Sequence, residues 1–178
     1  MATDGKNESA QQDLGDQVHG QQHFYDIGRA GQRRGELGIW RATIRDLPQL
    51  VMWGREFHAE SPWSDMPFNM SDLADTFLAA MNSDRAYLAV SDHGFILGYL
   101  DNVFFNKDAV FAREALWWAK SNGKPLLDSF EAWALDNGAT SVIIGHPAYE
   151  DQRKNETLGR LFTRRGYKPI ERHMVKVL

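Results

Sequence analysis

The chain has 178 residues, a length typical of one domain with a single hydrophobic core. Its formal net charge is −4 at pH 7, so we expect no nucleic-acid partner bound through an overall positive charge. The absence of cysteine excludes disulfides, thiolate nucleophiles and cysteine-ligated zinc. The 6 histidines show no metal-ligand spacing, and we expect no metal site.

No apolar run in the sequence approaches the length of a membrane span, and the first residues contain no hydrophobic signal segment. We therefore expect no membrane partner. These features are typical of a cytoplasmic protein, and the lack of cysteine fits a reducing compartment.

Residues 1–38 differ in composition from the rest of the chain. They are rich in Gln and Gly and show no apolar period, so on their own they cannot bury enough surface to offset the entropy of ordering. We interpret them as a low-complexity N-terminal tail or as an extended arm that orders on a protein partner. The residues that would anchor such an arm are Phe24, Tyr25, Ile27, Arg29, Arg33 and Arg34.

Residues 39–178 carry the hydrophobic periodicity of a folded domain. Alternating or continuously apolar stretches predict strands at 39–44, 86–90, 95–105, 113–118, 141–145 and 170–177. Apolar residues at helical spacing predict helices at about 46–57, 71–81, 124–137 and 155–165. The order of these elements predicts an α+β fold in which helices cover both faces of one mixed central β-sheet.

The predicted helix ends follow from capping residues. Asp46 and Ser71 are suitable N-caps for the first two helices, because a short polar side chain can accept a hydrogen bond from a free backbone N–H. Gly138 and Gly166 fit the C-terminal ends of the last two helices, where glycine readily takes a left-handed conformation. The apolar stripe of the helix at 124–137 consists of Leu126, Leu127, Phe130, Trp133 and Ala134.

Several short segments of this domain occur in the order and spacing of a known family. Near the C-terminus, Asn155, Leu158 and Phe162 are followed by Gly166 and Tyr167. The other similar segments are Arg41–Pro48, His58–Pro62, Leu126–Leu127, Glu131–Ala134 and Gly138–Ala139. In these residues the domain resembles the GCN5-related N-acetyltransferase (GNAT) family, and especially the members carried by tailed phages.

The resemblance implies a GNAT-like fold and an acetyl-CoA-dependent N-acetyltransferase that transfers an acetyl group to a small amine or a protein lysine. A second function stays open: a catalytically degenerate phage protein that acts as a virion component or a protein-binding inhibitor, with the N-terminal arm contacting the partner. The expected location is the cytoplasm, which for a phage-encoded protein means the host cytoplasm or the virion.

The phosphate loop of the family is altered in this chain. The family places Arg or Gln, two residues, Gly, one residue and then Gly or Ala before the helix, whereas this chain has Trp118, Ser121 and Gly123 at those positions. We interpret the loop as degenerate, with Lys120 and Lys124 either supplying charge to phosphate groups or facing solvent. The resemblance implies that acetyl-CoA contacts Trp118, Ala119, Lys120, Ser121, Asn122, Gly123, Lys124 and Asn155.

The resemblance also implies a catalytic base on the central strand. Acetyl transfer to an amine needs a group that removes a proton, and Glu114 is the candidate; the alternative is a strand-end charge bonded to backbone or to Arg113. The family's usual proton donor is a tyrosine of the last helix, and this chain has Phe162 there. Tyr149 and Tyr167 are the candidate substitutes.

Further residues near the expected site have two interpretations each. His58 and Glu60 either contact an amine acceptor or pack the end of the first helix. His146 either lies along the pantetheine arm that the resemblance implies or, as we expect, is a satisfied strand-end histidine. Trp117 and Trp118 should face opposite sides of the sheet, because side chains alternate along a strand. The residues that either face solvent or contact an acidic partner or a CoA phosphate are Arg153, Lys154, Arg160, Arg164, Arg165, Lys168, Arg172 and Lys176.

Overall fold

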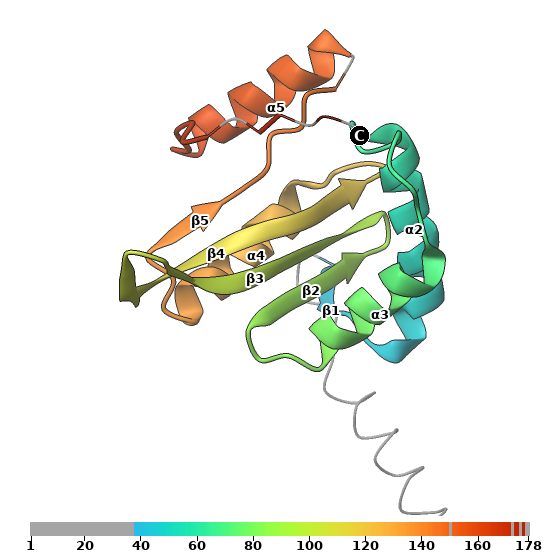
Figure 1. The fold of residues 1–178 in the computed structure, drawn as a ribbon, viewed down its shortest axis with the longest axis horizontal. Helices are drawn as coiled ribbons and strands as arrows, with labels where there is room; N and C mark the ends of the chain where they lie inside the picture. The colour runs from blue at the N-terminus through green and yellow to red at the C-terminus, as the bar shows by residue number, and fades with distance from the viewer. Residues whose placement is uncertain (1–37, 150, 172, 175, 177–178) are drawn as a thin grey trace, which may run out of the picture.

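The structure is a computed structural model that describes residues 38–149, 151–171, 173, 174 and 176 (Figure 1). The N-terminal tail or arm predicted at 1–38 lies outside the described residues except for Gly38. Its division from the domain at 39–178 therefore stays a prediction.

The centre of the domain is a 5-stranded mixed sheet whose strands follow one another across the sheet in chain order. The strands are β1 (Trp40–Arg41), β2 (Ala86–Ser91), β3 (Gly94–Val103), β4 (Asn106–Ala119) and β5 (Ser141–Ile143). The first three pairings are antiparallel, and β4 pairs with β5 in parallel. The parallel pair is possible because a helix crosses over between these two strands.

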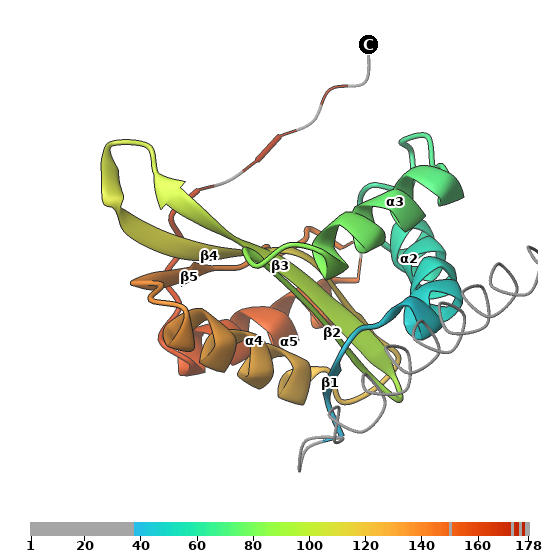
Figure 2. The same ribbon diagram turned by 90° about the horizontal axis from the view of Figure 1, so that it is seen from below.

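Helices cover both faces of the sheet, as predicted (Figure 2). They are the 3-10 helix η1 (Ile44–Asp46) and the α-helices α2 (Leu47–Glu60), α3 (Met70–Met81), α4 (Lys124–Asp136) and α5 (Gln152–Arg164). Helices α2 and α3 pack on one face, and α4 and α5 pack on the other. The α+β class and the GNAT-like layering expected from the resemblance are confirmed.

Each face of the sheet has its own hydrophobic core. The α2 core lies between the sheet and helices α2 and α3, and the α4 core lies between the sheet and helices α4 and α5. On β2, Leu88 and Val90 face α2 and α3, whereas Tyr87 and Ala89 face α4 and α5. A strand with both faces covered reads as a continuous apolar run, which is what β2 shows. In the α4 core, Phe130 is fully buried against Gly98, where a Cβ would lie 2.5 Å from the Phe130 ring.

A β-bulge in β4 sets which way the site residues point. The register with β3 shifts between Leu97 and Gly98, so that Gly98 pairs with Glu114 and Leu97 with Leu116. The extra residue reverses the alternation along β4. After the bulge, Trp117 packs in the α4 core and Trp118 in the α2 core, which confirms that the two indoles face opposite sides.

The first strand is shorter than predicted. The strand expected at 39–44 is reduced to Trp40–Arg41, because the backbone N–H and the hydroxyl of Thr43 both donate to the Asp46 carboxylate, at 2.8 and 2.9 Å. These bonds turn the chain into η1, from which α2 continues with Pro48 in its first turn.

Two helix starts also differ from the predictions. Ser71 is not the N-cap of α3: Asn69 is, and its side chain accepts the Ser71 N–H at 2.9 Å. Helix α5 begins at Gln152 and not at 155, because Asp151 caps it by accepting the N–H of Arg153 at 2.9 Å. Gly138 and Gly166 end α4 and α5 with positive φ, as predicted.

Two further strands differ in length from the predictions. The first residues of β4 include polar ones that do not show a strand pattern, and beyond β5 a side chain takes the place of a strand partner. Strand β4 begins at Asn106 and not at 113, so the β3–β4 hairpin turns at the exposed Phe104 and Phe105 and projects from the sheet (Figure 2). Strand β5 ends at Ile143 and not at 145, because the Gly145 N–H donates to a glutamate side chain of β4.

The strand predicted at 170–177 is wrong for the described residues 170, 171, 173, 174 and 176, none of which lies in a strand. Ile170 and Met174 are 73% and 90% exposed and belong to neither core. The other described residues here are Glu171, His173 and Lys176, so the described part of this stretch offers no continuous apolar face that a sheet edge could bury.

Candidate active site

Glu114 lies where β4 and β5 separate. The last described pair of these strands is Arg113 with Ile143, and β4 then continues to Ala119. The Glu114 carboxylate accepts a hydrogen bond from the Gly145 N–H at 3.0 Å. Arg113 pairs instead with Asp101 at 3.2 Å, so of the two alternative partners for Glu114 only the backbone one is present.

The electrostatic environment of Glu114 suits a base that works near neutral pH. Burial raises the pKa of the Glu114 carboxyl from its ordinary 4.5 to about 7, and the Gly145 N–H opposes this effect by stabilising the charged form. A carboxyl with this pKa is partly ionised at pH 7 and can accept a proton there.

Tyr149 lies on the loop that joins β5 to α5, and Asn155 fixes its backbone. The Asn155 carboxamide accepts the Tyr149 N–H at 2.9 Å and donates to the Tyr149 carbonyl oxygen at 2.6 Å. The ammonium of Lys154 lies 3.8 Å from the centre of the Tyr149 ring. The pKa of the Tyr149 phenol is raised by burial, then by the negative charges of Glu114 and Glu60.

The C-terminal half of α2 contacts Trp118, in β4, and Lys120, directly after β4. The Trp118 indole N–H donates to the Glu60 carboxylate at 3.3 Å. Lys120 forms an ion pair with Glu56 at 3.2 Å and places its ammonium 5.7 Å from the Trp118 ring. Trp118 and Lys120, two of the residues expected to contact acetyl-CoA, are therefore turned toward α2 and not toward α4.

The remaining residues of the predicted phosphate loop lead into the N-terminus of α4. Within the described part of the chain, the backbone N–H groups of Ser121, Asn122, Gly123 and Lys124 have no hydrogen-bond partner. Free N–H groups at a helix N-terminus, with the adjacent Lys124 charge, fit a phosphate or diphosphate. Pro125 has no N–H, so the first turn offers one donor fewer than usual.

Trp117 lies beneath this loop. Its indole Nε1 is buried and has no hydrogen-bond partner among the described residues. A Cβ on Gly123 would lie 3.2 Å from that nitrogen. Because residue 123 is glycine, the loop backbone can lie directly against the indole.

The structure resolves the alternatives for the two histidines. His58 Nε2 lies 2.9 Å from the Met66 carbonyl oxygen and its ring packs on Phe68, so His58 holds the loop after α2, as the packing alternative predicted. His146 Nε2 lies 3.0 Å from the Asn155 carbonyl oxygen and its ring meets Phe162 edge-on. His146 is thus a satisfied histidine, as expected.

The structure also shows an ion-pair cluster that the sequence analysis missed. Arg165, after α5, pairs with Asp128 at 2.6 Å and with Glu131 at 2.5 Å, both on α4. The Tyr167 phenol donates to Glu131 at 2.7 Å, and its pKa is raised, first by burial and then by this bond. The partners are far apart in the sequence, so no local pattern could have revealed them.

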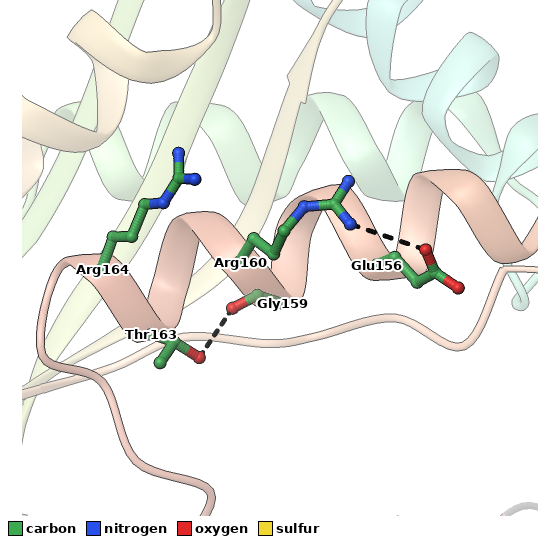
Figure 3. A pocket seen from close by; sticks show the side chains of 5 residues that line it. All are labelled: Glu156, Gly159, Arg160, Thr163 and Arg164. Atoms are coloured by element: carbon green, nitrogen blue, oxygen red, sulfur yellow. Dashed lines mark hydrogen bonds and ion pairs between the residues drawn. The ribbon is translucent and has the colours of Figure 1, made fainter.

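An open hollow lies along the outer side of α5 and is lined by Glu156, Gly159, Arg160, Thr163 and Arg164 (Figure 3). Glu156 pairs with Arg160 at 3.5 Å, and the Thr163 hydroxyl donates to the Gly159 carbonyl oxygen at 2.9 Å. All five residues belong to α5, and Arg160 and Arg164 are two of the basic residues predicted either to face solvent or to contact an acidic partner or a CoA phosphate. Glu114 and residues 118–124 do not line the hollow.

Two negative findings concern the described residues alone. No helix in this part of the chain is both long and apolar enough to cross a membrane. No group of three or more His, Asp or Glu side chains among these residues is arranged to hold a metal ion.

Comparison of the sequence with protein families gave no match, and comparison with curated proteins gave none either. The structure, in contrast, is similar to solved acetyltransferases. A possible acetyltransferase from Clostridium difficile 630 aligns over 79% of this chain and 95% of its own, with a TM-score of 0.60 and 12% identity. The chain therefore has an acetyltransferase fold.

Two further structures with this fold carry ligands. A predicted acetyltransferase from Clostridium acetobutylicum, solved with acetyl-CoA, aligns over 78% of this chain and 94% of its own, with a TM-score of 0.57 and 13% identity. The aminoglycoside N-acetyltransferase AAC(6')-Iy, solved with a CoA bisubstrate analogue, aligns over 79% and 96%, with a TM-score of 0.56 and 12% identity. At these identities the likeness concerns the fold.

Proposed function

We propose that this protein is a GNAT-family N-acetyltransferase that transfers an acetyl group from acetyl-CoA to an amine, either a small amine or a protein lysine. The observation that carries the proposal is the position of Glu114, a carboxyl with a pKa of about 7 where β4 and β5 separate in an acetyltransferase fold. The similar structures solved with acetyl-CoA and with a CoA bisubstrate analogue support it.

In this proposal Glu114 is the catalytic base. An amine is protonated at neutral pH and must lose a proton to attack a carbonyl carbon. The ionised Glu114 carboxylate accepts that proton, directly or through a water molecule. The Gly145 N–H keeps one carboxylate oxygen in place, which leaves the other oxygen for the proton.

The free N–H groups of residues 121–124 and the ammonium of Lys124 are the groups we propose for the diphosphate of acetyl-CoA. When bound, acetyl-CoA supplies an activated acetyl thioester. Ala119 lies at the end of β4 beside this loop and packs in the α4 core. Trp118 and Lys120 contact α2 in the structure, and for them the predicted role in binding acetyl-CoA stays a prediction.

The proposed transfer is tested by measuring CoA release from acetyl-CoA with a panel of aminoglycosides, polyamines and lysine peptides. Glu114→Gln should lower kcat by about 10²–10⁴ with the best acceptor, because the isosteric amide cannot accept the proton. Glu171 is an exposed glutamate near the C-terminus, so Glu171→Gln is the matched control and should leave the rate unchanged. Absence of CoA release with every acceptor would overturn the proposal, as would an unchanged rate for Glu114→Gln.

The second candidate is a catalytically degenerate domain that binds a protein partner. It is favoured by Phe162 at the family's tyrosine position and by the contacts of Trp118 and Lys120 with α2. A protein that releases no CoA but captures a partner through residues 1–38 would support this candidate. A phage origin, and action as a virion component or an inhibitor, stay predictions from the sequence.

A further inference from the structure

The ammonium of Lys120 lies on an aromatic ring and beside a carboxylate of α2. Lys120 follows β4, and its backbone N–H donates to the His93 carbonyl oxygen at 2.8 Å, which fixes the start of its side chain. The ammonium lies 3.2 Å from the Glu56 carboxylate and 5.7 Å from the centre of the Trp118 ring. This place suits a cation, because the face of an indole and a carboxylate both attract positive charge.

Glu60 adds a second carboxylate at the same ring. Glu56 and Glu60 are four residues apart on α2 and therefore lie on one face of that helix. Glu60 accepts the Trp118 indole N–H at 3.3 Å, and no cation among the described residues pairs with it. Because two carboxylates share the single ammonium of Lys120, negative charge is in excess around Trp118.

We propose that Trp118, Glu56 and Glu60 form a binding site for an ammonium group of the acceptor. Lys120 occupies this site until an acceptor ammonium replaces it. Because one ammonium fills the site and a second amine must react near Glu114, the acceptor belongs to the diamines and polyamines. This inference rests on the proposed acetyl transfer and names the class of its acceptor. It gives Trp118 and Lys120 a role different from the contact with acetyl-CoA that the resemblance implies.

The Lys120 ammonium is exchangeable, whereas the ring beneath it is fixed. The side chains of Lys120 and Glu56 are 57% and 36% exposed, so solutes can reach the pair. An ion pair as exposed as this one stabilises a fold little, because water and salt screen it. Trp118 is 8% exposed and packs on Trp53 with ring centres 6.1 Å apart, so the ring keeps its position when the lysine leaves.

Glu114 lies within reach of an acceptor bound at Trp118. The two residues are four positions apart on β4, a separation of about 13 Å or less along the strand. In the described part of the chain no strand pairs with β4 beyond Arg113 on the β5 side, so an acceptor that crosses this edge can contact both residues. The pKa of the Tyr149 phenol is raised by burial and then by the charges of Glu114 and Glu60, which places both carboxylates near one side chain.

Calorimetric titration with spermidine, a polyamine, and butylamine, a monoamine, tests the site without acetyl-CoA. We expect spermidine to bind the wild type about tenfold more tightly than butylamine. Lys120→Met removes the competing ammonium and keeps a similar chain length, so it should tighten spermidine binding about fivefold. Lys107 is an exposed lysine of the β3–β4 hairpin, so Lys107→Met is the matched control and should change the Kd less than about twofold.

The indole N–H signal of Trp118 in a proton–nitrogen NMR spectrum locates the bound amine. Spermidine should shift this signal, because an ammonium at the ring also contacts Glu60, the acceptor of that N–H. The signal of Trp133, which packs in the α4 core on the other face of the sheet, should not move. Spermidine that binds without shifting the Trp118 signal would overturn the site, as would equal spermidine affinity of Lys120→Met and the wild type.

Glu60→Gln tests the site during acetyl transfer, because the amide still accepts the Trp118 N–H but carries no charge. We expect the KM of spermidine to rise about fivefold, kcat to stay within about twofold, and the KM of butylamine to stay unchanged. Glu171→Gln, at an exposed glutamate, should leave both KM values unchanged. An equal rise in KM for both amines would show that Glu60 does not hold a second ammonium.

Failure of this inference can be told apart from failure of the proposed function. If the wild type releases CoA and uses spermidine and butylamine with equal kcat/KM, the acceptor class is wrong although acetyl transfer stands. If spermidine binds as predicted and the wild type releases no CoA with any acceptor, the cation site exists but the proposed function fails. The assignment of polyamines as acceptors then fails with it.

Discussion

Single residues decide what chemistry the site can perform, and Glu114 is the clearest case. A glutamate in a strand is ordinary in a sequence, and the candidate role came from the resemblance. Its pKa is raised by burial and lowered in part by the Gly145 N–H, and both are features of the tertiary structure. The bonds of Asn155 to Tyr149 and of Trp118 to Glu60 depend likewise on loop and helix packing that no local pattern encodes.

The raised pKa of Glu114 predicts a pH dependence of stability. Because the folded state holds the proton more tightly than the unfolded state, the contribution of this group is full below pH 4.5 and is lost as the pH rises through about 7. The free energy of unfolding should therefore fall by about 2–3 kcal/mol between pH 5 and pH 8 from this group.

Urea unfolding of the wild type and of Glu114→Gln at pH 5 and pH 8 measures this contribution. The variant should lose the decline, so that its stability relative to the wild type increases with pH. Glu171→Gln should keep the wild-type slope, since its side chain is 67% exposed. Equal slopes for Glu114→Gln and the wild type would show that the Glu114 carboxyl is not perturbed.

At the scale of elements, the sequence predicts those whose residues have a clear period. The stripe of α4 is buried at Leu126, Leu127, Phe130 and Ala134, as predicted, whereas Trp133 is partly exposed and stacks on Tyr87 and Phe130. The ends of elements were less predictable, because they depend on side-chain bonds such as that of Thr43 to Asp46.

The burial of α4 predicts the cost of truncating its stripe. Phe130→Ala should lower the free energy of unfolding by about 3–5 kcal/mol, because Phe130 is 0% exposed and fills the space above Gly98. Leu135→Ala is the matched control on the same helix, since Leu135 is 74% exposed, and it should cost less than about 0.5 kcal/mol. A loss below about 1 kcal/mol for Phe130→Ala, measured by chemical denaturation, would contradict the packing of this helix.

At the scale of the whole molecule, the element order alone predicted the layers of the fold, because a helix between two strands must cover one sheet face. The described residues of the predicted last strand are the exception, since Ile170 and Met174 are exposed and belong to neither core. The α4–α5 cluster around Arg165 was not predictable, although it joins two helices of the same layer.

The independence of the domain from its N-terminal segment is a prediction at this scale. Among the described residues, both hydrophobic cores are formed by residues from 39 onward, and the sequence of residues 1–35 shows no apolar period of its own. Deletion of residues 1–35 should therefore leave the melting temperature of the domain within about 2 °C of the full-length value in a thermal melt. A large drop would show that the segment packs on the domain. If the full-length protein captures a protein partner and the deletion variant does not, the result favours the interpretation of this segment as an arm that binds a partner.

The binding of acetyl-CoA tests the central claim most directly. Titration calorimetry should show binding to the wild type, and a hundredfold excess of acetyl-CoA over its Kd should stabilise the fold by about 2.7 kcal/mol. Lys124→Glu should weaken binding severalfold, because it places a negative charge beside the free N–H groups of the loop, whereas Lys107→Glu on the distant hairpin should not. If millimolar acetyl-CoA produces no heat of binding and no change in melting temperature, the claim is contradicted.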